Sequence, residues 1–113
     1  MSDEHGAVHD ACARQPGAEL SYPFGEQPAV YKVAGKIFAV VGSDERPPRI
    51  TLKCDPEHGE ALRGEHAAIT PGYHMNKRHW ITVTLDGSLP PTMIEELIED
   101  SYDLVAPAKP SKR

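Results

Sequence analysis

The chain has 113 residues, of which 39% are hydrophobic and 26% are charged, and its formal net charge is −5 at pH 7. This size and composition predict one compact globular domain, and the negative charge argues against nonspecific DNA binding, which depends mostly on phosphate neutralisation. The sequence holds no apolar run of about 18 residues and no basic-then-apolar leader, so we expect no membrane span and a cytoplasmic protein.

The first part of the chain predicts one helix followed by an edge strand. Residues 3–15 carry an apolar stripe at helical spacing, and Pro16-Gly17 ends it. Cys12 belongs to this stripe, and with Cys54 it is expected to be a reduced, partly buried thiol, since neither cysteine belongs to a paired motif. Over residues 20–24, large apolar residues alternate with polar or small ones, which predicts a strand. Pro23 marks it as an edge or irregular strand.

The central part predicts a β-hairpin and a further strand. Residues 30–33 and 36–41 read as two strands joined by a tight turn at Ala34-Gly35, because glycine accepts a positive φ. Residues 49–54 alternate strictly, which places Ile50, Leu52 and Cys54 toward the core. The same alternation places Arg49, Thr51 and Lys53 on the open side of the sheet.

The last part predicts helix, loop, strand and helix. Asp55 is suited to cap a short helix that ends at Gly64, and a long loop follows over residues 65–79. Residues 80–85 form a strand, and from Pro91 to Val105 the apolar residues follow a complete helical stripe. The outer face of this last helix is acidic, with Glu95, Glu96, Glu99, Asp100 and Asp103.

This order of elements predicts an α+β fold in a single domain, with a mostly antiparallel sheet packed against the N- and C-terminal helices. We expect the domain to cover residues 1–106 and residues 107–113 to be a flexible tail. The sequence does not define the oligomeric state, and a monomer is favoured.

The segments "VAGKIFAVV", "ITLKC", "YHMNKRHWITVTLDGSLP" and "LIEDSYDLV" occur in this order over roughly residues 6–106. In these segments the chain resembles the MmcQ/YjbR family of small bacterial proteins. The resemblance implies a CyaY-like, or double-wing, α/β fold and a DNA-binding label that rests on that shape. A label of this kind is an analogy between folds and assigns no chemistry.

The stretch "GYHMNKRHW" over residues 72–80 is the densest gathering of chemically active side chains. Aromatic and cationic groups around a concavity suit an anionic or aromatic ligand. The ligand-binding candidates are therefore Tyr73, His74, Asn76, Lys77, His79, Trp80 and Tyr102. Cations beside aromatic side chains also suit phosphates and unpaired bases. The nucleic-acid candidates are Lys36, Arg49, Lys53, Lys77 and Arg78.

The sequence favours neither catalysis nor a native metal site. His5 and His9 are four residues apart but lack the glutamate of a zinc-protease motif, and His74 and His79 have no evident third ligand. Cys54 precedes a helix, and His58 and His74 are the candidate bases for activating it, yet the alternation favours a buried, inert thiol. Ser101 is expected to bond a backbone carbonyl. No cofactor is predicted.

Three interpretations stay open at this point. In the first, the domain is a non-enzymatic binding module for nucleic acid or a protein partner. In the second, it binds a small anionic or aromatic molecule in a pocket at "YHMNKRHW". In the third, that segment is an architectural clasp in which Trp80 anchors the sheet to a helix and Lys77 pairs with an acid of the last helix.

Overall fold

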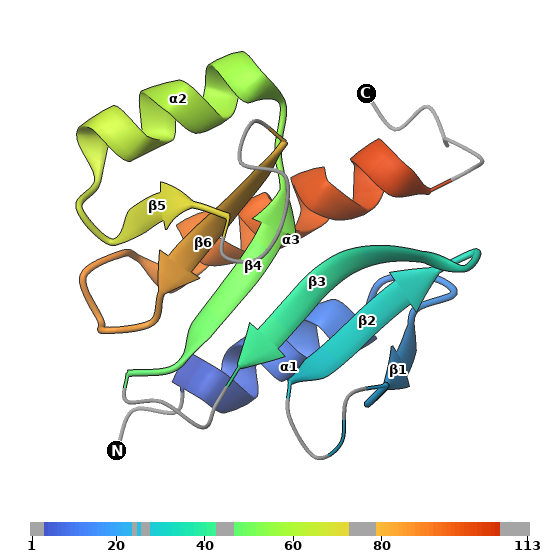
Figure 1. Ribbon diagram of the computed structural model, residues 1–113. Helices are drawn as coiled ribbons and strands as arrows, with labels where there is room; N and C mark the ends of the chain where they lie inside the picture. Colours follow the sequence, from blue (N-terminus) through green and yellow to red (C-terminus); the bar gives the residue numbers. More distant parts are fainter. Residues whose placement is uncertain (1–3, 24, 26–27, 43–46, 73–78, 107–113) are drawn as a thin grey trace.

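The computed structural model describes residues 4–23, 25, 28–42, 47–72 and 79–106. Figure 1 shows a twisted sheet with helices α1 and α3 behind it and helix α2 beyond strands β5 and β6. Some of the predictions concern residues outside the described part: residue 24 of the predicted edge strand, residues 73–78 of the predicted loop and the predicted tail at residues 107–113. The elements in chain order are α1 (Glu4–Ala13), β1 (Glu19–Ser21), β2 (Ala29–Val33), β3 (Lys36–Gly42), β4 (Arg49–Lys53), α2 (Pro56–Glu65), β5 (Ile69–Pro71), β6 (Trp80–Thr84) and α3 (Pro91–Val105).

The described strands form one six-stranded sheet in the order β1-β2-β3-β4-β6-β5. All neighbouring pairs are antiparallel. Helix α2 and strand β5 lie between β4 and β6 in the sequence, and they let β6 return beside β4. The predicted α+β class, with N- and C-terminal helices on an antiparallel sheet, is confirmed.

The core lies between one face of the sheet and the helices, and we call this side of the sheet the helix face. Leu52 of β4, Ile81 of β6 and Ile98 of α3 are at most 1% exposed in it. The predicted stripe of α3 supplies Ile94, Leu97, Ile98, Ser101 and Val105 as buried residues. Burial of this apolar stripe, at about 25 cal/mol per Å², is what holds α3 to the sheet.

Helix α2 also covers the helix face, at the end formed by β5 and β6. Gly59 of α2 lies so close to the sheet that a Cβ atom there would be 3.4 Å from Ile81 Cγ2. Ile81 pairs with Leu52 of β4, so the two side chains share one face. The small residue at position 59 thus allows α2 to pack on the same side as α3.

The N-terminus of α2 is capped as predicted. The Asp55 carboxylate accepts a hydrogen bond from the Glu57 backbone N–H at 3.0 Å, and Pro56 occupies the first turn. The helix continues one residue beyond the predicted stop at Gly64, and His66 is its C-cap residue. Boundaries of this kind commonly shift by one residue because helix ends are held by few hydrogen bonds.

Replacing Asp55 with alanine is expected to lower the free energy of unfolding by about 0.5–2 kcal/mol, because the Glu57 N–H loses its acceptor. Urea unfolding followed by circular dichroism measures the change. Asp55→Asn keeps a side-chain acceptor at the same place and is the control, with a smaller loss expected. Equal losses for the two variants would contradict the capping role.

Two local details differ from the sequence predictions. In the β2–β3 turn both residues have positive φ, with 53° at Ala34 and 80° at Gly35, whereas only the glycine was expected to do so. Two successive positive φ values are typical of the hairpin turn whose twist matches its strands. Strand β5 was missed, because three residues ending in a proline show too little alternation to be distinguished from a loop.

None of the helices in the described part of the chain is both long and apolar enough to cross a membrane.

Candidate functional site

The side of the sheet opposite the helices carries a strip of polar and basic residues, which we call the open face. Its members are Arg49, Thr51 and Lys53 of β4 with their cross-strand partners Thr84, Thr82 and Trp80 of β6. Its two central threonines, Thr51 and Thr82, are only 7% and 2% exposed, and their hydroxyl groups share a hydrogen bond of 3.0 Å. The alternation predicted for residues 49–54 is confirmed on the core side, where Ile50 and Leu52 are completely buried. On the other side Arg49 and Lys53 are half-buried, whereas Thr51 is buried, contrary to the open position expected for it. The two cations thus lie at opposite ends of one strand and on one face.

Lys53 and Trp80 form a cation–aromatic pair at one end of the open face. The Lys53 Nζ atom lies 5.8 Å from the centroid of the Trp80 ring. The two residues are directly opposite each other in the β4–β6 register, so the backbone brings them together. A cation within about 6 Å of an aromatic centroid is attracted by the ring electrons. The pair therefore offers a charged group and a planar surface side by side.

The backbone around Trp80 is held from both sides. The Trp80 carbonyl accepts a hydrogen bond from the Gly72 N–H at 2.9 Å, and the preceding His79 carbonyl accepts one from the Cys54 N–H at 2.8 Å. A Cβ atom at Gly72 would lie 2.5 Å from Trp80 Cβ, which is closer than real Cβ atoms approach. Glycine at position 72 is therefore what allows β6 to begin with a large aromatic residue in this place.

The structure brings together only part of the predicted ligand-binding set. Tyr73, His74, Asn76 and Lys77 lie outside the described residues, as does the nucleic-acid candidate Arg78. His79 is exposed just before β6, and Trp80 is half-buried on the open face. Trp80 thus belongs to the side of the sheet opposite α1 and α3, which differs from the clasp interpretation in which it anchors the sheet to a helix.

Tyr102 and Lys36 lie apart from this face. The Tyr102 ring packs edge-on against Phe38 at 5.5 Å between centroids, and its hydroxyl donates to the Pro16 carbonyl. Tyr102 therefore joins α3 to the start of the α1–β1 connection, within the helix layer. Lys36 is exposed at the first position of β3, beside the hairpin turn. The described nucleic-acid candidates on the open face are Arg49 and Lys53.

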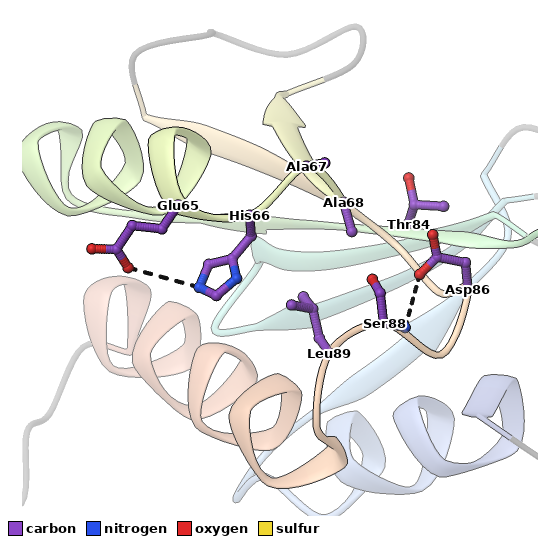
Figure 2. Close-up of a pocket in the computed structure, with 8 residues that line it drawn as sticks. All are labelled: Glu65, His66, Ala67, Ala68, Thr84, Asp86, Ser88 and Leu89. Carbon is purple, nitrogen blue, oxygen red and sulfur yellow. Dashed lines mark hydrogen bonds and ion pairs between the residues drawn. The ribbon is translucent and has the colours of Figure 1, made fainter.

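A surface cavity of about 380 Å³ lies where α2, β6 and the β6–α3 connection meet, as Figure 2 shows. His66 pairs with Glu65 at 3.8 Å, and the Ser88 N–H donates to the Asp86 carboxylate at 3.0 Å. Hydrogen bonds from Ser88 lower the pKa of Asp86, which stays ionised at neutral pH. Two carboxylates suit a cation better than an anion. The cavity shares no residue with the predicted pocket, and no motif of the sequence indicated it.

Of the two histidines considered as partners of Cys54, His58 lies near it, with 3.7 Å between Sγ and Nδ1, and His74 lies outside the described residues. Burial raises the pKa of the Cys54 thiol, and the nearby Asp100 and Asp55 carboxylates raise it further. A neutral, buried thiol is a poor nucleophile, because the thiolate is the reactive form. Cys54 thus has the packing role that the alternation predicted.

His9 links the first helix to the sheet. His9 Nδ1 lies 2.6 Å from the Tyr31 hydroxyl, which joins α1 to β2. Within the described residues, no three His, Cys, Asp or Glu side chains gather as a metal site requires.

The fold and the open face together define a small, helix-backed antiparallel sheet domain whose candidate site is a surface with a cation–aromatic pair. A family model described as YjbR matches residues 13–104. The chain belongs to the YjbR family, as the sequence motifs predicted.

Relatives of known sequence or structure support this assignment. The uncharacterized protein YjbR of Escherichia coli K12 is 39% identical over 102 residues, which cover 90% of this chain and 86% of that protein. The Deinococcus radiodurans protein DR2400 has 41% identity and a TM-score of 0.82, covering 87% of this chain and 75% of that structure. A Pseudomonas syringae protein has 32% identity and a TM-score of 0.75, covering 92% and 98%. These names state no ligand, so function has to be argued from the site.

Proposed function

We propose that this chain is a non-enzymatic binding module whose open face holds nucleic acid in single-stranded form. The observation that supports the proposal is the Lys53 ammonium group 5.8 Å from the Trp80 ring, with Arg49 on the same strand and the same face. Cations contact phosphate oxygens, and the accessible part of an aromatic ring stacks on an unpaired base, which contributes about 1–3 kcal/mol per base. Bases inside a duplex are already stacked, so a single strand fits this pair better.

The acidic net charge is compatible with this proposal, because the charges are separated in space. The acids of α3 belong to a helix that packs on the helix face, whereas Arg49 and Lys53 lie on the opposite side. At physiological salt the screening length is about 8 Å, which is close to the thickness of the sheet and its side chains. A ligand on the open face is thus separated from the carboxylates of α3 by the sheet, and salt weakens their repulsion further.

The test is a fluorescence anisotropy titration with a short labelled single-stranded oligonucleotide and its duplex, at several salt concentrations. We expect the single strand to bind more tightly than the duplex. Lys53→Gln and Arg49→Gln should each weaken binding and reduce the salt slope of log K by about 1, because each removes one phosphate contact. Trp80→Ala should cost about 1–3 kcal/mol of binding free energy through lost stacking.

A matched control is available on the other side of the molecule. Arg14 is an exposed cation that lies 3.9 Å from Glu95 of α3. Arg14→Gln removes one positive charge, as the two site variants do, and should leave the affinity unchanged. If neither oligonucleotide binds at about 50 mM salt, where phosphate contacts are strong, the proposal is wrong.

A small anionic molecule with an aromatic ring would use the same pair of residues, and this is the second candidate function. A panel of nucleotides in the same titration separates the two. A mononucleotide that binds as tightly as the oligonucleotide, with a small salt slope, would favour the small-molecule function. If all of these ligands fail to bind, a role in contacting another protein becomes the better interpretation of the open face.

A further inference from the structure

Ser101 of α3 makes an unusual connection between two strands of the sheet. Its side chain is completely buried, and its hydroxyl donates a hydrogen bond to the Phe38 carbonyl of β3 at 2.6 Å. The same oxygen accepts a hydrogen bond from the Lys53 backbone N–H of β4 at 2.9 Å. A serine hydroxyl can do both at once, because it has one donor and two acceptor positions. The predicted bond from Ser101 to a backbone carbonyl is confirmed, and its partner belongs to the sheet.

The bridge occurs where strand β3 is irregular. Tyr31 pairs with Ala39 and Lys32 pairs with Ile37, so Phe38 is left without a partner in β2. This is the arrangement of a β-bulge, which bends a strand and redirects a side chain. The Phe38 ring accordingly packs against Tyr102 of α3. On the side of β3 that faces β4, the paired residues are Ala39 to Gly42, so the pairing stops next to Phe38.

The Ser101 hydroxyl takes the place of the next backbone contact between β3 and β4. Ala39 pairs with Leu52, so the following position would set Phe38 opposite Lys53. There the hydroxyl lies between the Phe38 carbonyl and the Lys53 N–H and bonds both. Without it, a buried carbonyl and the last N–H of β4 would both lose their partner, which is costly. The position of the Lys53 backbone therefore depends on α3.

We propose that Ser101 is a positioning residue for the cation–aromatic pair of the open face. By fixing the end of β4 from behind the sheet, it sets the point from which the Lys53 side chain reaches the Trp80 ring. The effect of Ser101 on affinity rests on the function proposed above. Its effect on the geometry of Lys53 and Trp80 does not require any ligand.

The geometric test uses NMR spectroscopy of the protein without ligand. The Trp80 ring should shift the resonances of the Lys53 side-chain methylene protons upfield. In Ser101→Ala we expect this shift to shrink and the hydrogen exchange of the Lys53 amide to accelerate at least tenfold. Ser101→Cys keeps a group that donates and accepts weakly, so it should give an intermediate result and provides a second variant if the alanine variant folds poorly.

A stability-matched control separates positioning from a general loss of packing. Ile98 is also completely buried in α3, one turn before Ser101, and none of the polar contacts described above involves its side chain. Ile98→Val removes one methylene from the same helix and should leave the Lys53 resonances unchanged. If Ile98→Val changes the Lys53 and Trp80 signals as much as Ser101→Ala does, or if neither changes them, the positioning role is overturned.

The affinity test is a double-mutant cycle with the single-stranded oligonucleotide. Ser101→Ala alone should weaken binding several-fold. On the Lys53→Gln background the same substitution should have almost no further effect, because a residue that acts through Lys53 has nothing left to position. Additive losses would overturn the proposal. If the wild-type protein does not bind the oligonucleotide, the proposed function fails, and the NMR result still decides the role of Ser101.

Discussion

Replacing Gly72 with alanine is expected to destabilise the protein by about 1–3 kcal/mol, the usual range for an atom forced into a filled space. The added Cβ would lie 2.5 Å from Trp80 Cβ and 3.0 Å from both the carbonyl carbon and the carbonyl oxygen of Trp80. None of these atoms belongs to the end of a flexible side chain. The clash can therefore be relieved only by moving the start of β6 away from residue 72.

That movement should also reach the candidate site. The hydrogen bond from the Gly72 N–H to the Trp80 carbonyl, now 2.9 Å, would lengthen, and the Trp80 ring would change its position relative to Lys53. Urea unfolding followed by tryptophan fluorescence measures the stability, and the emission of the folded state reports on the ring. Because Trp80 is the one tryptophan of the chain, the signal has a single source.

Gly64→Ala is the matched control for this experiment. Gly64 lies in α2, and an added Cβ there would meet no atom within 4 Å. Alanine is a better helix former than glycine by about 0.8–1 kcal/mol in a helix interior, so near the end of α2 this variant should be neutral or slightly more stable. Equal stabilities of the two variants would show that residue 72 tolerates a side chain and that Trp80 is not held by close packing.

The parts of the fold that the sequence predicted are those whose signal is local. The i, i+3, i+4 stripe of α3 and the alternation of residues 49–54 are written in consecutive residues, and burial of Ile50, Leu52 and Ile98 follows from them. The short strand β5 has no such signal. Its existence depends on pairing with β6, in which Ile69 lies opposite Val83.

The candidate site likewise combines features that have a local signal in the sequence with features that depend on contacts between distant residues. The alternation predicted that Arg49 and Lys53 share the open side, but it could not predict that Lys53 would meet Trp80, because this depends on the β4–β6 register. The bridge through Ser101 joins residues that are 48 and 63 positions apart in the chain. Tyr102 was assigned to the predicted pocket as an aromatic side chain, whereas the structure packs its ring against Phe38.

The second large effect is expected at alkaline pH and comes from Cys12. The thiol is completely buried, and this burial raises its pKa from 9.0 to about 12. Above pH 9 the unfolded chain therefore releases a proton that the folded protein retains. Stability is fully present below pH 9 and is lost as the pH rises toward 12. At 1.36 kcal/mol per pKa unit, the loss at the upper end is on the order of 4 kcal/mol.

The measurement is urea unfolding in the presence of a reductant at about pH 8 and about pH 11, with Cys12→Ala as the comparison. The alanine variant should be somewhat less stable at pH 8, because it leaves a small cavity. Its loss of stability between the two pH values should be much smaller than that of the wild type. The dependence of stability on pH that remains in this variant is assigned to Tyr31 and Cys54. Burial raises the pKa of Tyr31 to about 12, and it also raises the pKa of Cys54.

This result would establish more than the alkaline limit of the fold, because the prediction requires that Cys12 is a reduced thiol buried between α1 and its neighbours. If the two proteins lose the same stability between pH 8 and pH 11, the thiol is accessible to water and α1 is not docked as described. A steep loss that becomes much smaller with Cys12→Ala would instead place the N-terminal helix firmly in the core.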